Sequence, residues 1–230
     1  LLSFFCAAAL LAAPGLNAQP AAAPAAARSF KGPQPGDLAP DFTVFGPDGR
    51  EVKLSDFRGK IVLLDIWATW CGPCVAAMPH NSELAEKYAA EGLVILAVCA
   101  SDTRENYDGW VQRNSAKFKF LTAHDAAGKD FPNSVFRNQW GVSMFPSYFV
   151  IGRDGRVVGR AGGGGSQENP RVTRLLAEAG LSIPTAHLPP EKAAAPKSVP
   201  MAGNAAAQPA APTMRFANMA AGESVPDVET

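Results

Sequence analysis

The chain has 230 residues, 47% of them hydrophobic, which is enough to fill one large core but not two full domains. Its 21 basic and 21 acidic residues leave no net charge and form no run of Lys or Arg, so the sequence favours neither nucleic-acid binding nor a polybasic membrane contact. Four cysteines are too few for a disulfide framework, and three histidines without paired spacing predict no metal site.

The two ends of the chain differ in composition from its middle. Residues 1–13 are uncharged and mostly apolar and stop at Pro14-Gly15, a length typical of a signal-peptide core. We predict a signal peptide or N-terminal anchor over 1–18, with cleavage after Ala18 or Ala27 and retention as an anchor as the alternatives. Residues 19–31 predict an Ala/Pro linker, and residues 184–230 a disordered Ala/Pro-rich tail, because such segments bury too little apolar surface to offset their ordering entropy.

Residues 32–183 remain as one folded domain. Residues 61–67 are a nearly continuous apolar run, which is typical of a buried central strand. The predicted elements before residue 101 are, in chain order, a hairpin of strands 41–45 and 51–54, a strand 61–67, a helix 74–91 and a strand 93–100. They are followed by a helix 102–113, a strand 118–123, a helical piece 135–140, a hairpin of strands 147–151 and 156–160, and a helix 168–179. Gly92 is predicted to stop the first helix, and Asp102 and Glu105 are predicted to form a capping box at the start of the second. This alternation predicts an α/β fold with a central mixed sheet flanked by helices and an N-terminal β-hairpin extension.

The chemistry is carried by Cys71 and Cys74, which follow the buried strand and open the next helix. The positive end of the helix dipole favours a thiolate there, and two intervening residues place both sulfurs on one turn. Pro73 costs little, since a first-turn residue has no helical N–H bond to lose. We expect Cys71 to be the exposed nucleophile and Cys74 the buried resolving thiol, their disulfide being the only redox group and no cofactor being needed.

The segment Trp67-Ala68-Thr69-Trp70-Cys71-Gly72-Pro73-Cys74 resembles the active-site segment of the thioredoxin superfamily. Residues 36–42 (GDLAPDF) and 141–151 (GVSMFPSYFVI) resemble its exported TlpA/ResA branch, a redoxin-type domain. The resemblance covers about residues 32–181. It implies a thioredoxin-like fold and a periplasmic or membrane-tethered reductant acting on oxidised exported proteins, apocytochrome c among them.

Several single positions carry over from this resemblance. Pro146 matches the family's cis-proline, and Phe145 before it would offer its backbone to an extended substrate. Trp70, Gly72 and Pro73 would contact substrate as well, while Trp67 is expected in the core. Pro79 matches a proline that kinks the active-site helix.

Asp65 matches the buried aspartate of thioredoxins, six residues before the first cysteine, whereas Ala77 stands where the exported branch often has Glu. A carboxylate among Leu63, Leu64 and Ile66 is desolvated, which raises its pKa toward neutrality. We therefore predict that Asp65 is the general base toward Cys74. The alternative is an Asp on the solvated side of its strand.

The Gly72-Pro73 dipeptide is that of thioredoxins and favours a reducing potential. In an oxidising compartment such a protein needs a membrane electron donor, so we expect that partner, a periplasmic or other extracytoplasmic location, no nucleic acid, and a monomer. We expect Cys99 to be inert packing and His80 and His124 to be surface or cap residues.

Three other functions remain as alternatives. A peroxiredoxin would place Thr or Ser three residues, and Pro seven residues, before its reactive cysteine, where this chain has Ala68 and Leu64. A Sco-like copper chaperone would separate its cysteines by three residues and add a distant His, for which His124 is a weak candidate. The third alternative is an interaction module whose cysteines are only a structural clip.

Overall fold

The computed structural model describes residues 32–163, 169–184 and 186. The leader predicted over 1–18 and the linker predicted over 19–31 lie outside the described residues. So does the tail predicted over 184–230, apart from Pro184 and Ala186. Within the described part, no helix combines the length and the hydropathy needed to cross a bilayer.

A seven-stranded mixed sheet forms the centre of the domain, with strand order β2-β1-β5-β4-β3-β6-β7. Parallel pairing joins β3 to β4 and β4 to β5, and the remaining neighbours are antiparallel. The strands are β1 (Thr43–Phe45), β2 (Glu51–Lys53), β3 (Ile61–Trp67), β4 (Leu93–Cys99), β5 (Leu121–His124), β6 (Ser147–Ile151) and β7 (Val157–Gly162). The β1–β2 hairpin extends the sheet beyond β5, as predicted.

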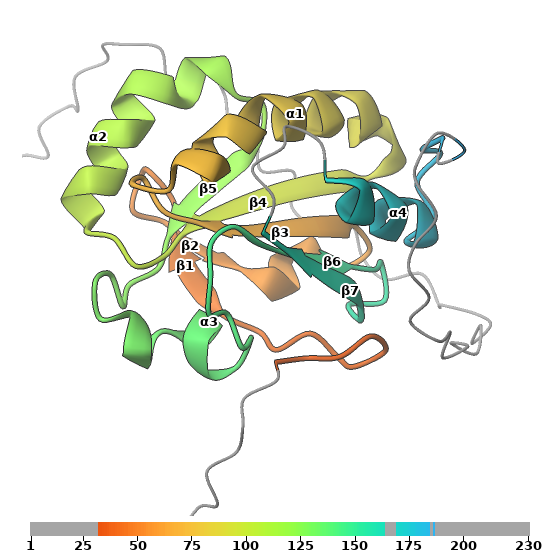
Figure 1. Ribbon diagram of the computed structural model, residues 1–230, viewed down its shortest axis with the longest axis horizontal. Coiled ribbons are helices and arrows are strands. Elements are labelled where there is room, and N and C mark those ends of the chain that lie inside the picture. The colour runs from red at the N-terminus through yellow and green to blue at the C-terminus, as the bar shows by residue number, and fades with distance from the viewer. Residues whose placement is uncertain (1–31, 164–168, 185, 187–230) are drawn as a thin grey trace, which may run out of the picture.

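Helices cover both faces of this sheet (Figure 1). They are α1 (Gly72–Tyr88), α2 (Arg104–Asn114), α3 (Val135–Asn138) and α4 (Pro170–Glu178), with single 3₁₀ turns at Leu54–Phe57, Ala89–Glu91, Ser115–Lys117 and Phe131–Asn133. In Figure 1, α1 and α2 lie on one side of the sheet and α3 on the other. The core is therefore divided into two layers by the sheet.

The alternation of β3 assigns its side chains to these layers, because successive residues of a strand point to opposite faces. Val62, Leu64 and Ile66 belong to the layer that holds Phe136 of α3. Ile61 and Leu63 pack with α1 and α4, and Trp67 packs with α1 and α2. Asp65 has the parity of this second set, so it faces α1.

Several elements begin at other residues than predicted. Helix α1 begins at Gly72 rather than Cys74, because Cys71 itself is the N-cap. Helix α2 is capped by Thr103, whose side chain accepts from the Asn106 N–H, so Asp102 and Glu105 form no capping box. Strand β5 starts three residues later than predicted, and α4 starts at Pro170 after an Asn169 cap.

Candidate functional site

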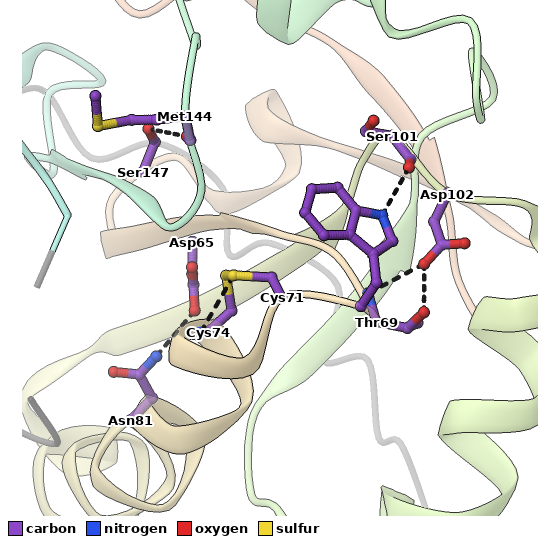
Figure 2. Close-up of a disulfide and its surroundings, with 10 residues drawn as sticks. Asp65, Thr69, Cys71, Cys74, Asn81, Ser101, Asp102, Met144 and Ser147 are labelled. Carbon is purple, nitrogen blue, oxygen red and sulfur yellow. Dashed lines mark hydrogen bonds between the residues drawn. A yellow bond between two sulfur atoms is a disulfide. The ribbon is translucent and has the colours of Figure 1, made fainter. Parts of the chain in front are cut away.

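The disulfide between Cys71 and Cys74 lies at the junction of β3 and α1 (Figure 2). Cys71 is the N-cap of α1, and its sulfur accepts a hydrogen bond from the Cys74 N–H at 3.3 Å. The positive end of the α1 dipole and the Cys74 N–H therefore lie at the sulfur of Cys71, which stabilises negative charge there once the disulfide is reduced.

Exposure differs between the two cysteines in the expected direction but less than expected. Cys74 is fully buried and Cys71 is 5% exposed in this oxidised form. The prediction of an exposed Cys71 is therefore too strong, because its side chain packs in the buried cluster that also holds Trp67 and Met78. Gly72 and Pro73, between the two cysteines, are exposed.

Aromatic side chains border the disulfide. Trp70 is 62% exposed, and its ring centroid lies 5.6 Å from that of Phe145. Phe145 in turn packs against the cluster that contains both cysteines. The Phe145–Pro146 peptide bond is cis, as predicted from the resemblance. The structure thus brings Trp70 and Phe145 together beside the disulfide, with Pro146 directly after Phe145, although Pro146 lies 75 residues after Cys71 in the chain.

Asp65 is fully buried, so the solvated alternative is wrong. Its Oδ2 accepts a hydrogen bond from Asn81 Nδ2 at 3.0 Å, while its Oδ1 is buried and has no partner. Burial raises the pKa of Asp65 to about 8, and the Asn81 hydrogen bond acts against that rise. A carboxyl group with such a pKa can both accept and release a proton near neutral pH.

A second buried carboxylate, Asp102, holds the loop that precedes the disulfide. Its Oδ2 accepts from the backbone N–H of Thr69 at 3.1 Å and from the Thr69 hydroxyl. Its Oδ1 accepts from the Thr103 N–H at 2.9 Å and from Asn106 Nδ2 at 2.8 Å. Burial alone would raise the pKa of Asp102, but these hydrogen bonds outweigh it and hold the pKa below the ordinary value.

The loop that carries Asp102 makes two further contacts. The Ser101 carbonyl accepts from the Trp70 indole Nε1 at 3.1 Å, and Ser101 adopts a positive φ of 61°. His124 lies behind the loop, with Nε2 3.0 Å from the Asp102 carbonyl oxygen. His124 is buried, so its placement at the surface is wrong, whereas His80 is half-buried on α1.

Cys99 ends β4 opposite Trp67 and is fully buried, as expected of a packing residue. Burial raises its pKa, and the nearby Asp102 carboxylate adds to the rise. Within the described ranges, no group of three His, Cys, Asp or Glu side chains is arranged to hold a metal ion.

Sequence reasoning missed two of these groups. Asn81 could have been noticed as an amide on the apolar face of the helix, seven residues after Cys74. The part played by Asp102 had no local signal, since its partner Thr69 lies 33 residues away.

Comparison with known proteins agrees with this geometry. The Redoxin family pattern matches residues 34–176. The thiol-disulfide oxidoreductase ResA of Geobacillus thermodenitrificans is 36% identical over 122 residues, which cover 53% of this chain and 66% of that protein. The chain therefore spans slightly less than two thirds of that relative's length.

Two solved structures share the fold. A protein described as a thiol:disulfide interchange protein DsbE of Chlorobium tepidum is 31% identical with a TM-score of 0.54, covering 64% of this chain and 98% of its own. A crystal structure described as a thiol-disulfide oxidoreductase of Bacteroides vulgatus is 26% identical with a TM-score of 0.53, covering 62% and 95%. The predicted thioredoxin-like α/β fold is therefore confirmed.

Proposed function

The chain belongs to the Redoxin family, and on that basis we propose that it is an exported thiol–disulfide oxidoreductase that reduces protein disulfides with Cys71 and Cys74. The observation that carries this proposal is the disulfide closed across the first turn of α1, with one sulfur at the N-cap and the other fully buried. The relatives named as thiol-disulfide oxidoreductases support the same reaction class.

The reaction has two exchange steps. The Cys71 thiolate attacks one sulfur of a substrate disulfide, and the other substrate sulfur leaves as a thiolate that takes a proton from solvent. Cys74 then loses its proton and attacks the Cys71 sulfur. The bond between Cys71 and the substrate breaks, the second substrate thiolate leaves and is protonated, and the Cys71–Cys74 disulfide forms. The substrate gains two electrons and the protein loses two.

Asp65 is the group proposed to take the proton from Cys74. Its burial and its raised pKa of about 8 support this role. In Asp65→Asn we expect resolution of the mixed disulfide to slow at least about tenfold near pH 7 and to lose its inflection in the pH profile. Stopped-flow kinetics across pH 6 to 9 would measure this. Unchanged resolution kinetics would remove Asp65 from the mechanism.

The substrate is proposed to be an oxidised exported protein, apocytochrome c included, bound as an extended segment along Phe145 and Pro146 and against Trp70, Gly72 and Pro73. The exposed Trp70 ring and the exposed Gly72-Pro73 dipeptide support this surface. Export is proposed from the apolar residues 1–13, and a membrane electron donor from the need to recharge a reducing dithiol in an oxidising compartment.

The test compares wild type with Cys71→Ser and Cys74→Ser. Wild type should catalyse insulin reduction by dithiothreitol, and both variants should lose this activity. Cys74→Ser should in addition accumulate a mixed disulfide through Cys71, from which the substrate can be identified by mass spectrometry. An absence of catalysis by the wild type, with the disulfide intact, would favour the structural-clip alternative instead.

A further inference from the structure

Asn81 interrupts the apolar face that α1 turns toward the sheet. The residues buried on this helix are otherwise largely apolar, and they include Ala77, Met78 and Leu84. Asn81 is 4% exposed, so its amide has left water and needs a partner inside the protein. That partner is Asp65, whose Oδ2 lies 3.0 Å from Asn81 Nδ2.

The same helix carries the resolving cysteine. Asn81 follows Cys74 by seven residues, which is close to two full turns, so both side chains lie on one face about 10 Å apart along the axis. Figure 2 shows the Asp65 side chain directed from β3 toward this helix, with its carboxylate joined to Asn81. One oxygen of the carboxylate is thereby occupied, and the other has no partner.

We propose that Asn81 is a positioning residue for the resolving step: its amide fixes one oxygen of Asp65 and leaves the other free for proton exchange with Cys74. This inference rests on the proposed function. We expect Asn81 to touch neither the sulfurs nor the substrate and to act on the resolving step through Asp65, although its side chain is also hydrogen-bonded with Tyr148.

The surroundings of Asp65 explain why one hydrogen bond matters. In the register of the sheet, Ala97 of β4 and Tyr148 of β6 stand beside it, with Cys99 two residues beyond Ala97. Burial raises the pKa values of both Tyr148 and Cys99, so both groups are uncharged near pH 7, and the side chain of Tyr148 is also hydrogen-bonded with that of Asn81. The Asn81 amide is the contact that opposes the effect of burial on the pKa of Asp65.

The proton transfer follows from this arrangement. The Cys74 thiol gives its proton to the free Oδ1 of Asp65, and the resulting thiolate forms the new bond to the Cys71 sulfur as the bond from Cys71 to the substrate breaks. Asp65 afterwards returns its proton to solvent or to the departing thiolate. Without the Asn81 amide, the ionised form of Asp65 is less stable, and less of it is present at neutral pH.

The test uses two variants that lose the amide but change packing in opposite ways. Asn81→Leu keeps the site filled with an apolar side chain, and Asn81→Ala leaves a cavity there. Reduced protein is mixed with 5,5′-dithiobis(2-nitrobenzoate) in a stopped-flow instrument, where the first release of thiolate reports attack by Cys71 and the second reports resolution by Cys74. In both variants we expect the midpoint of the second phase to move up by about one pH unit, and its rate at pH 7 to fall about three- to tenfold, with the first phase unchanged.

Two controls separate positioning from a general loss of structure. Ser82→Ala removes the neighbouring, partly buried hydrogen bond that the Lys119 N–H donates to Ser82 Oγ (2.8 Å), and it should lower stability without moving the midpoint. Asn81→Leu in an Asp65→Asn background should have no further effect on the pH profile. A shift in only one of the two Asn81 variants, or an equal shift in Ser82→Ala, would overturn the inference.

A readout without substrate keeps this inference separate from the proposed function. The carboxyl carbon of Asp65 can be titrated by NMR in the oxidised protein, and its midpoint should rise in both Asn81 variants. If wild type reduces no protein disulfide but this midpoint rises, the proposed function fails and the Asn81–Asp65 coupling stands. If reduction is normal and the midpoint is unchanged, the Asn81 inference alone fails.

Discussion

Two buried carboxylates flank the active-site loop, and they differ in the number of hydrogen bonds they receive. Asp65, below α1, accepts one side-chain hydrogen bond and keeps one oxygen unpartnered, and burial raises its pKa to about 8. Asp102, in the loop between β4 and α2, accepts four hydrogen bonds from Thr69, Thr103 and Asn106, and its pKa lies below the ordinary value.

The comparison shows that burial alone does not decide the charge of a carboxyl group. The number of hydrogen-bond donors around the carboxyl group also sets its charge, because each hydrogen bond to the ionised form offsets part of the lost hydration. Asp102 is fixed as an anion and is suited to hold backbone. Asp65 stays near its titration midpoint and is suited to move a proton.

The largest expected effect is on the stability of Asp65→Asn. The unfolded chain loses this proton near pH 3.8, whereas the folded protein keeps it until about pH 8, so the free energy of unfolding contributed by Asp65 falls as pH rises between these values. At about 1.4 kcal/mol per pH unit, Asp65→Asn should be more stable than wild type by about 4 kcal/mol at pH 7 and nearly equal to it at pH 4. Urea unfolding of the oxidised proteins across this range measures the difference. A pH-independent difference would contradict the raised pKa.

Asp102→Asn should change the free energy of unfolding in the opposite direction to Asp65→Asn. The asparagine amide presents N–H groups to a loop that already offers donors, so we expect the free energy of unfolding at pH 7 to fall by about 2–4 kcal/mol. Because the pKa of Asp102 is lowered in the folded protein, its ionised form stabilises the fold at neutral pH, and this stabilisation is lost as the pH falls through the pKa of folded Asp102. The difference between wild type and variant, measured by urea unfolding at pH 7 and then at increasingly acid pH, should therefore shrink in acid. A stabilised variant would break the comparison.

The smallest effect is expected for Trp70→Phe. This change removes the indole hydrogen bond to the Ser101 carbonyl but keeps an aromatic ring beside Phe145. Because Trp70 is largely exposed, the free energy of unfolding should fall by less than about 1 kcal/mol. Thermal unfolding measures this, with Asp102→Asn as the reference. A loss as large as that of Asp102→Asn would mean that Trp70, rather than Asp102, holds the loop.

Local patterns predicted the parts of the site that depend on neighbouring residues. The apolar run 61–67 predicted β3 with its observed bounds, and that strand together with the helix start located Cys71, Cys74 and the burial of Asp65. The resemblance to a known family predicted the cis peptide at Pro146, which no local pattern requires.

Long-range contacts account for what was missed. The sequence predicts Asp102 as a helix cap, because a carboxylate before a helix usually caps it. In the structure the Asp102 side chain instead accepts a hydrogen bond from Thr69, which follows β3, and Thr103 is the cap. His124 reads as a surface residue because it ends a strand, but the Asp102 loop covers it. Neither outcome follows from sequence spacing, since each depends on how β3, β4 and β5 align.

The complete burial of Cys99 has a consequence for any redox cycle of this domain. A third thiol within the described residues could trap either active-site cysteine in a wrong disulfide. Cys99 is enclosed at the end of β4 and kept as a neutral thiol, so it is a poor nucleophile toward either partner. We therefore expect Cys99 to stay out of the exchange between Cys71 and Cys74, so that each cycle carries two electrons.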